Sequence, residues 1–255
     1  MTQVLYLDEL TYLEAKKLNK KESIIFLPMG PLESHGPHLP LGVDIRGAEV
    51  TCKMAAEKII KKGFQPIIAP TMPYTLADVA MPFSGTVTLS PKTLKYFIND
   101  LSKSFAYHEF ENLVIFCHHG EIPNFKAINE AVKEAQKHGI NILNSSAMFE
   151  GMRENVKLIK GKYPELDAHA GEAETALYMW KFPNLVKKDI LNGLIDNWSP
   201  LRNNLASGAK DLVEAGGPQA YFGSPAKATA ETGKYVYETL SDLLVQEIKN
   251  FMDTT

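Results

Sequence analysis

The chain has 255 residues, with 27 Lys and Arg against 30 Asp and Glu, so its formal net charge is −3 when His is neutral. Hydrophobic residues make up 45% of the sequence and charged residues 22%, which are ordinary globular values and exclude an intrinsically disordered chain or a fibrous repeat. The near-neutral charge gives no electrostatic reason to expect nucleic acid or an anionic membrane as a partner.

The first residues and the two cysteines indicate the cellular compartment. Residues 1–4 lack the basic start and apolar run of a secretory signal, and no stretch approaches the roughly 20 apolar residues of a membrane span. Two cysteines, Cys52 and Cys117, cannot form a disulfide framework, and we expect both to be buried apolar residues. A reduced, cytoplasmic compartment is therefore predicted.

Short apolar runs alternate with amphipathic stretches along the chain. The runs at 23–27, 66–69, 113–117 and 140–143 predict buried strands, and the stretches at 46–62, 91–107, 125–138 and 229–251 predict helices. This alternation predicts an α/β fold of three layers, with a mainly parallel central sheet and helices on both faces. No linker interrupts the pattern, so we expect one domain over residues 1–255, with functional loops at 70–86 and 192–225.

The loop that follows the first strand carries unusual chemistry. Residues 29–44 contain three prolines and three glycines, which favour a rigid, irregular loop, and they carry Glu33, His35, His38 and Asp44. Ligands of open α/β sheets bind at the carboxyl ends of the strands, where this loop would lie. A turn-rich connection with solvated side chains is the alternative, and the four chemically active side chains argue against it.

A second polar segment, residues 118–124, follows the strand at 113–117 in the same way. Together the two segments offer three carboxylates and two imidazoles without sulfur: Glu33, His35, Asp44, His119 and Glu121. Such a set suits Zn, Mn or Fe(II), and we expect two divalent ions per chain, with Zn favoured. Three negative charges leave about +1 on two such ions, which one metal-bound hydroxide would neutralise. Asp44 is the expected bridge, because one carboxylate can offer an oxygen to each ion.

A third segment, residues 167–175, leads into a helix that includes residues 177–180. His169 precedes the helix start, where helix and metal charges would tend to lower its pKa, and a neutral imidazole there could exchange a proton with a leaving amine. We predict acid–base work for Glu172 as well, although both Glu172 and Glu174 could instead orient ligands or favour the helix N-terminus. In the loop at 73–86, Tyr74 and Asp78 are candidate substrate-binding residues, unless that loop packs on a neighbouring subunit.

These segments resemble the creatininase (creatinine amidohydrolase) family. GPLESHGPHLPLGVD at 30–44 is close to the first signature of that family, and residues 168–175 and 222–233 resemble its second and third. The resemblance implies a dinuclear metal centre, a homohexamer and hydrolysis of a non-peptide C–N amide bond. It also implies that Glu33, Asp44 and His119 hold one ion, that His35, Asp44 and Glu121 hold the other, and that His169 transfers the proton.

The chain departs from the family pattern at two places. Most of the family has Asn-Gly-His-Gly-Gly-Asn at the middle motif, whereas residues 117–122 here read Cys-His-His-Gly-Glu-Ile, so that His118 stands where a glycine is usual. Creatinine hydrolases also place a tryptophan shortly before the third-segment histidine, and here residues 163–165 are Tyr-Pro-Glu. The amide chemistry is therefore the firmer prediction, and creatinine itself the weaker one.

The sequence thus predicts a metal-dependent hydrolase of a small cyclic amide, similar to creatinine amidohydrolase, that uses a hydroxide between two metals. A deformylase or amidohydrolase acting on a nucleotide-like or cofactor-precursor amide is the alternative, and it would need basic residues near the mouth, such as Arg46, Arg153 or Arg202. A catalytically silent metal-binding scaffold is the alternative outside the enzymes. We expect a homo-oligomer with no nucleic-acid partner, since there is no basic stripe.

Overall fold

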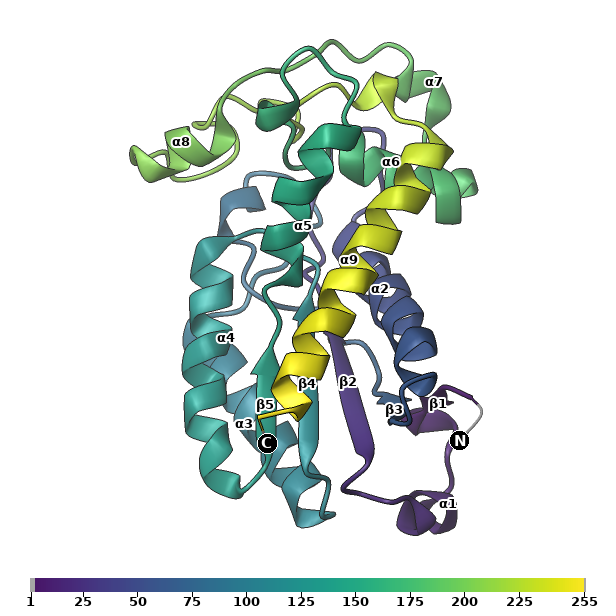
Figure 1. The fold of residues 1–255 in the computed structure, drawn as a ribbon. Coiled ribbons are helices and arrows are strands. Elements are labelled where there is room, and N and C mark those ends of the chain that lie inside the picture. The colour runs from purple at the N-terminus through teal and green to yellow at the C-terminus, as the bar shows by residue number, and fades with distance from the viewer. Residues whose placement is uncertain (1–2, 255) are drawn as a thin grey trace.

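The sheet at the centre of the molecule has five strands, all parallel. In this computed structural model, which describes residues 3–254, the strands lie in the order β1-β3-β2-β4-β5 (Figure 1). Their bounds are Leu5–Tyr6 for β1, Ser23–Met29 for β2, Gln65–Ile68 for β3, Asn112–Cys117 for β4 and Asn141–Asn144 for β5. The strands of β2, β3 and β4 are buried along their whole length, as their continuous apolar sequences predict.

Helices cover both faces of this sheet, which confirms the predicted three-layer α/β fold. One face packs on α3 (Pro91–Tyr107) and α4 (Ile122–Ala135), and the other packs on α2 (Val43–Ile60), α5 (Ala147–Asn155) and α9 (Ala230–Met252). The alternation of side chains along β2 divides them between the faces: Ile25 and Leu27 join the α3–α4 core, whereas Ile24 and Phe26 join the α2–α9 core.

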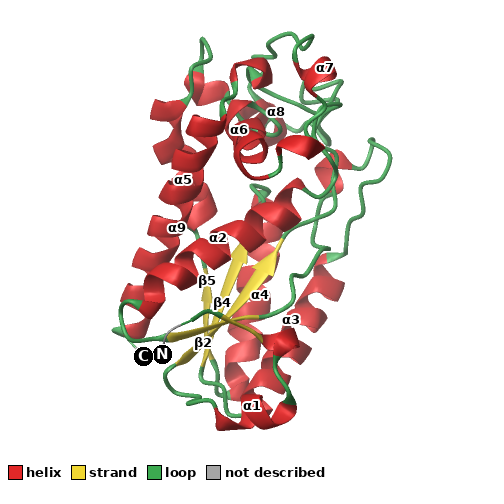
Figure 2. Cartoon of the chain, turned by 90° about the vertical axis from the view of Figure 1, so that its right-hand side faces the viewer, coloured by secondary structure: helices red, strands yellow, loops and turns green. Residues whose placement is uncertain are grey.

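The remaining helices are short and lie at the ends of the molecule. They are α1 (Tyr12–Lys17), α6 (Glu172–Lys181), α7 (Lys188–Leu191) and α8 (Leu201–Ala206). In Figure 2 the strands point toward the end of the molecule that carries α6, α7 and α8, so these helices stand above the carboxyl ends of the strands. The predicted strands and long helices are all present, whereas β1, α1, α5, α7 and α8 are too short to give a clear hydrophobic period.

Two helices begin earlier than the sequence predicts, and both shifts concern the polar segments. The predicted start of α2 was residue 46, but the helix begins at Val43, which places Asp44 in its first turn. Likewise α4 begins at Ile122 instead of residue 125, so that Glu121 is the residue at its N-cap. Carboxylates at these positions are favoured by the partial positive charge of a helix N-terminus.

The order of the strands creates a natural binding position. The chain leaves β2 through α2 toward β3, and it leaves β4 through α4 toward β5, so the connections diverge from two neighbouring strands toward opposite faces. A crevice outside the carboxyl ends of such a pair is where ligands bind in open α/β sheets. The polar segments after β2 and β4 both end in this crevice.

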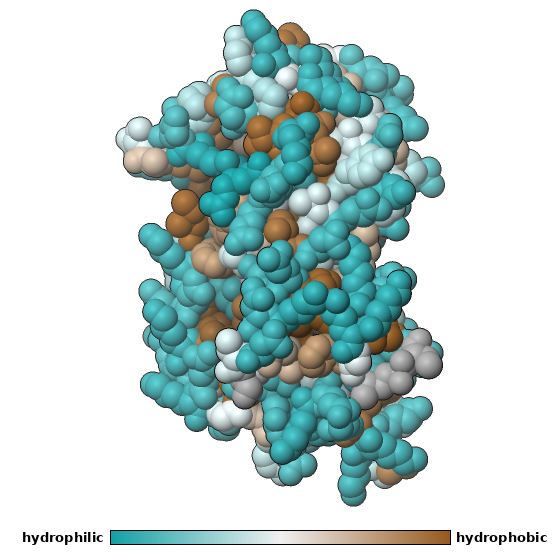
Figure 3. Space-filling view, viewed as in Figure 1, coloured by the Kyte–Doolittle hydropathy of each residue, from teal (hydrophilic) through white to brown (hydrophobic). Residues whose placement is uncertain are grey.

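None of the helices in residues 3–254 is long and apolar enough to cross a membrane. The face that carries α9 is mainly hydrophilic, with hydrophobic side chains showing in separate patches (Figure 3). Cys52 and Cys117 are buried and unpaired, as predicted.

Candidate metal centre

A first group of possible metal ligands joins three segments that are far apart in the sequence. Glu33 comes from the loop after β2, Asp44 from the first turn of α2 and His119 from the segment after β4, and their ligand atoms lie within 4.8 Å of one another. His119 Nδ1 lies 3.1 Å from Glu33 Oε1 and 3.6 Å from Asp44 Oδ2. All three side chains are buried, which a charged cluster tolerates only if a cation or protons compensate it.

A second group shares Asp44 with the first. His35 Nε2 lies 3.7 Å from Asp44 Oδ2 and 3.6 Å from Glu174 Oε2, and these three side chains again bring ligand atoms within 4.8 Å of one another. Glu174 stands in the first turn of α6, where the sequence left its role open. The sequence could not show that Glu174 lies close to His35, because this contact depends on how α6 packs against the rest of the protein.

Glu121 lies on the opposite side of His119 from these two groups. Its Oε2 is 3.2 Å from His119 Nε2, whereas His119 Nδ1 faces Glu33 and Asp44. Thus the structure brings four of the five predicted ligands together, and it places Glu121 where a carboxylate orients the imidazole that faces the metal site.

The polar atoms that face the interior of the cluster lack partners. Among the described residues, none forms a hydrogen bond with Glu33 Oε1, Glu33 Oε2, Asp44 Oδ2 or His35 Nε2, although His35 Nε2 lies within ion-pair distance of Glu33 Oε1 and of Asp44 Oδ2. Burial raises the pKa of Glu33 to about 8, and burial together with the nearby Asp44 raises the pKa of Glu174 well above its usual value. Crowded carboxylates of this kind are what a divalent cation stabilises, and the oxygen and imidazole donors suit Zn, Mn or Fe(II).

His169 borders the same cluster with a neutral ring. Its Nε2 donates a hydrogen bond to the Ser34 carbonyl oxygen at 2.6 Å, which leaves Nδ1 as the acceptor, 3.7 Å from Glu33 Oε1. The pKa of His169 is lowered to about 4, mainly by burial. The sequence predicted this direction from helix and metal charges, but desolvation is the larger cause.

Glu172 lies outside the candidate ligand groups, and the acid–base role predicted for it stays a prediction. Its fully buried carboxylate accepts hydrogen bonds from the backbone N–H groups of Lys160 and Gly161 at 2.9–3.0 Å. Asp167 in turn accepts hydrogen bonds from the N–H groups of Glu172 and Ala173 and so caps α6. These contacts place α6 and the 159–161 segment next to His169.

The third signature-like segment supports this arrangement through packing. A Cβ atom at Gly233, in the first turns of α9, would lie 1.9 Å from the backbone oxygen of Ala176 in α6, so only glycine permits the two helices to approach this closely. Thr229 caps α9 through a hydrogen bond from the Thr232 N–H. Phe222 of this segment also donates its N–H to the His169 carbonyl oxygen at 2.9 Å, so the segment positions both α6 and His169.

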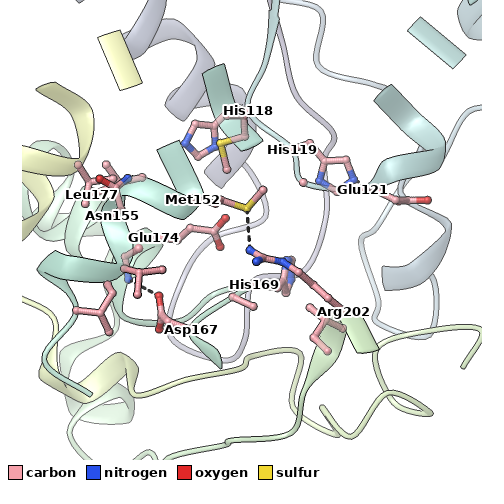
Figure 4. Close-up of a pocket in the computed structure, with 18 of the residues that line it drawn as sticks. His118, His119, Glu121, Met152, Asn155, Asp167, His169, Glu174, Leu177 and Arg202 are labelled. Carbon is pink, nitrogen blue, oxygen red and sulfur yellow. Dashed lines mark hydrogen bonds and ion pairs between the residues drawn. The ribbon is translucent and has the colours of Figure 1, made fainter. Parts of the chain in front are cut away.

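A cavity of about 130 Å³ opens beside the cluster, and His118, His119, Glu121, His169 and Glu174 line it (Figure 4). It is comparable in size to an apolar cavity of roughly 150 Å³ that holds benzene. Most of its remaining walls are aliphatic or methionine side chains: Val79, Met148, Met152, Val156, Ile159, Leu177, Leu201, Leu205, Leu212, Val236 and Leu240. Arg202 of α8 is the only Lys or Arg among the described lining residues, and its guanidinium contacts the Met152 sulfur at 3.3 Å.

The two candidate substrate-binding residues do not line this cavity. Tyr74 is exposed, and Asp78 accepts a hydrogen bond from Thr88 at 3.1 Å, whereas the adjacent Val79 reaches the cavity wall. The tryptophans are absent from the lining too, and Trp198 packs edge-on against Tyr163. Of the two predicted functional loops, the one at 192–225 contributes more, with Leu201, Arg202, Leu205 and Leu212.

Comparison with known proteins gives concordant matches. The sequence profile of one family, described as creatinine amidohydrolase, matches residues 8–248. A mycofactocin precursor peptide peptidase of Mycobacterium ulcerans (strain Agy99) is 28% identical over 228 residues, covering 88% of this chain and 84% of the relative. A creatinine amidohydrolase of Pseudomonas putida is 27% identical over 203 residues, covering 74% of this chain and 76% of the relative.

The fold is also shared with solved structures. A crystal structure of creatinine amidohydrolase (creatininase) superposes with a TM-score of 0.77 and 21% sequence identity, covering 96% of this chain and 97% of that chain. This likeness shows the three-layer fold, and the profile match shows the family.

Proposed function

The chain belongs to the creatininase family, and from this premise we propose that it is a metal-dependent hydrolase of C–N amide bonds that holds two divalent ions. The observation that carries the proposal is the buried cluster of unpartnered carboxylate and imidazole atoms beside an open cavity. A buried group of this kind is costly unless it binds a cation, which argues against a purely structural role.

The donor atoms divide into two sets around Asp44. Glu33, Asp44 and His119 would hold one ion, and His35, Asp44 and Glu174 would hold the other. The sequence predicted Glu121 for the second ion, but its distance to His119 Nε2 favours a role in orienting that ring. Zn is our first choice of metal, with Mn or Fe as the alternatives that the donors also suit.

Divalent ions bound here would polarise an amide carbonyl and lower the pKa of water at the site. The chain itself supplies the proton path. His169 donates its Nε2–H to the Ser34 carbonyl oxygen, and its Nδ1 lies near Glu33 at the edge of the cavity. Nδ1 can therefore take up a proton and deliver it to the departing nitrogen. The hydrophobic walls exclude water and strengthen the electrostatic interactions of the site.

Two substrate classes remain to be distinguished. The resemblance favours a small non-peptide cyclic amide such as creatinine. The aliphatic walls of the cavity and the positive charge of Arg202 favour instead an amide that carries a bulky apolar group and a carboxylate, as a short peptide does. Several relatives are described as peptide peptidases, which agrees with this second class. A nucleotide-like amide is less well supported, because Arg46 packs over Phe182 and neither Arg46 nor Arg153 lines the cavity.

We further propose a single domain over residues 1–255, a homo-oligomer, a cytoplasmic location and a small-molecule amide as the ligand, with no nucleic acid. These proposals rest on the sequence pattern and on the family resemblance.

The decisive experiment is elemental analysis of the purified protein combined with an amide panel. The panel contains creatinine, other cyclic amides, formamides and Leu- or Val-containing dipeptides with free and amidated carboxyl ends. Each amide is assayed before chelation, after chelation and after metal return. Two ions per chain with metal-dependent turnover of any member supports the proposal, and preference for free over amidated dipeptides supports the second substrate class. The absence of metal after reconstitution would refute the proposal.

A further inference from the structure

We infer that His118 is a positioning residue for the metal centre: it holds one oxygen of Asp44 and leaves the other oxygen to serve both metal groups. The inference rests on the proposed two-metal site.

The contact between the two side chains is direct and buried. His118 Nδ1 lies 3.2 Å from Asp44 Oδ1, and neither residue is more than 1% exposed. Because a carboxylate only accepts hydrogen bonds, Nδ1 must carry the ring proton. The other nitrogen, Nε2, has no partner among the described residues, and the ring borders the cavity.

The second oxygen of Asp44, Oδ2, faces both candidate ligand groups. Oδ2 is 3.7 Å from His35 Nε2 in one group and 3.6 Å from His119 Nδ1 in the other, and it accepts no hydrogen bond from the described residues. With Oδ1 held by His118, the arrangement differs from the bridge that the sequence predicted, in which each oxygen meets a different ion. Here Oδ2 is the oxygen that lies near both candidate ligand groups, so the orientation of the Asp44 carboxylate would affect both ions.

The ring of His118 has little freedom to turn away from Asp44. Gly47 lies one helical turn after Asp44 in α2, and a Cβ atom there would be 2.7 Å from three ring atoms of His118. Phe116 packs against the same ring in an edge-on arrangement, with the ring centroids 6.4 Å apart. The absence of a side chain at Gly47 therefore leaves room for the imidazole of His118.

The test compares variants of the full chain that keep or remove the donor. His118→Leu removes the N–H at similar volume, whereas His118→Asn retains a side-chain N–H near the position of Nδ1. The affinity of each site for Zn²⁺ is measured by chelator competition, and the stoichiometry by elemental analysis. Partners of metal ligands typically contribute 10- to 100-fold in affinity, so we expect His118→Leu to lose about that much at both sites and His118→Asn to recover most of it.

A second variant tests the same geometry without removing a polar group. Gly47→Ala pushes the ring of His118 aside, so it should weaken both sites, and it should have little further effect when combined with His118→Ala. A matched control is His138→Leu, which removes an exposed histidine that pairs with Asn99 far from the centre.

The outcomes separate this inference from the proposed function. Native Zn²⁺ affinity in folded His118→Leu, or loss at one site only, would overturn the inference while leaving the hydrolase proposal intact. If His118→Leu does not fold, Gly47→Ala decides in the same way: native Zn²⁺ affinity in the folded variant, or loss at one site only, would overturn the inference. A wild-type protein that binds fewer than two ions would overturn the inference, whereas two ions without any amide turnover would overturn only the proposed catalysis.

Discussion

Substitution of Glu172 by glutamine distinguishes a structural from a catalytic carboxylate. Glu172 accepts hydrogen bonds from two backbone N–H groups, those of Lys160 and Gly161. Hydrogen bonds to a charged group contribute about 1.5–3 kcal/mol each, and glutamine replaces Oε1 by an NH₂ group that cannot accept from the Lys160 N–H. Glu172→Gln should therefore lower the free energy of unfolding by about 1.5–3 kcal/mol, which for a chain of this length lowers the Tm by roughly 3–12 °C.

The assay is thermal unfolding by circular dichroism, together with the metal content at a temperature well below the transition. Glu172→Gln should keep two ions, since its carboxylate does not face the metal groups. Glu174→Gln is the matched control in the same helical turn: it should lose affinity at the His35 group and keep or gain stability, because burial disfavours its charge. An unchanged Tm with lost turnover in Glu172→Gln would refute this reasoning and restore the acid–base role.

Three further predictions concern the cluster itself. Asp44→Ala should lose both ions together, because Asp44 belongs to both groups, and elemental analysis that finds one ion retained would contradict the shared ligand. His169→Ala should keep both ions and lose about 10²–10⁴ in kcat, the usual range for acid–base catalysis, and full turnover would exclude its proton role. The metal-free chain should lose stability as the pH rises from about 6.5 to 8. Burial raises the pKa of Glu33 to about 8, so the folded state holds a proton that the unfolded chain has already released. Saturating Zn²⁺ should abolish this fall in Tm, because the cation replaces the proton, and a metal-free Tm that rises over this range would contradict the sign.

The fold was largely accessible from the sequence because its signals are local. The strands of β2, β3 and β4 are buried on both faces, so they are short continuous apolar runs, and the helices between them show a helical period. Boundaries were less accurate where polar residues open a helix. The sequence predicts Asp44 and Glu121 as loop residues, although each stands at a helix N-terminus, where its charge is favoured.

The candidate site was only partly accessible. The sequence predicts Glu33, His35, Asp44 and His119 as site residues from residue type and from their position after strands, and His169 from its place before a helix. The structure brings these five side chains together. Glu172 and Glu174 are two residues apart in the first turn of one helix, so they point in different directions: one toward the 159–161 backbone and the other toward His35.

The sequence by itself determined which donor atoms the protein possesses and at which edge of the sheet they emerge, because residue identity and hydrophobic period are local properties. The tertiary structure alone decided which face of His119 meets Glu121, that Glu174 joins His35, and that Oδ1 of Asp44 is held by a histidine 74 positions away. It also placed Arg202 and the aliphatic walls of the cavity beside the cluster, while Tyr74 stayed at the surface. These pairings depend on how closely α2, α6 and α9 approach their neighbours. Gly47 leaves room for the His118 ring and Gly233 for the Ala176 backbone, and no spacing within one segment records either contact.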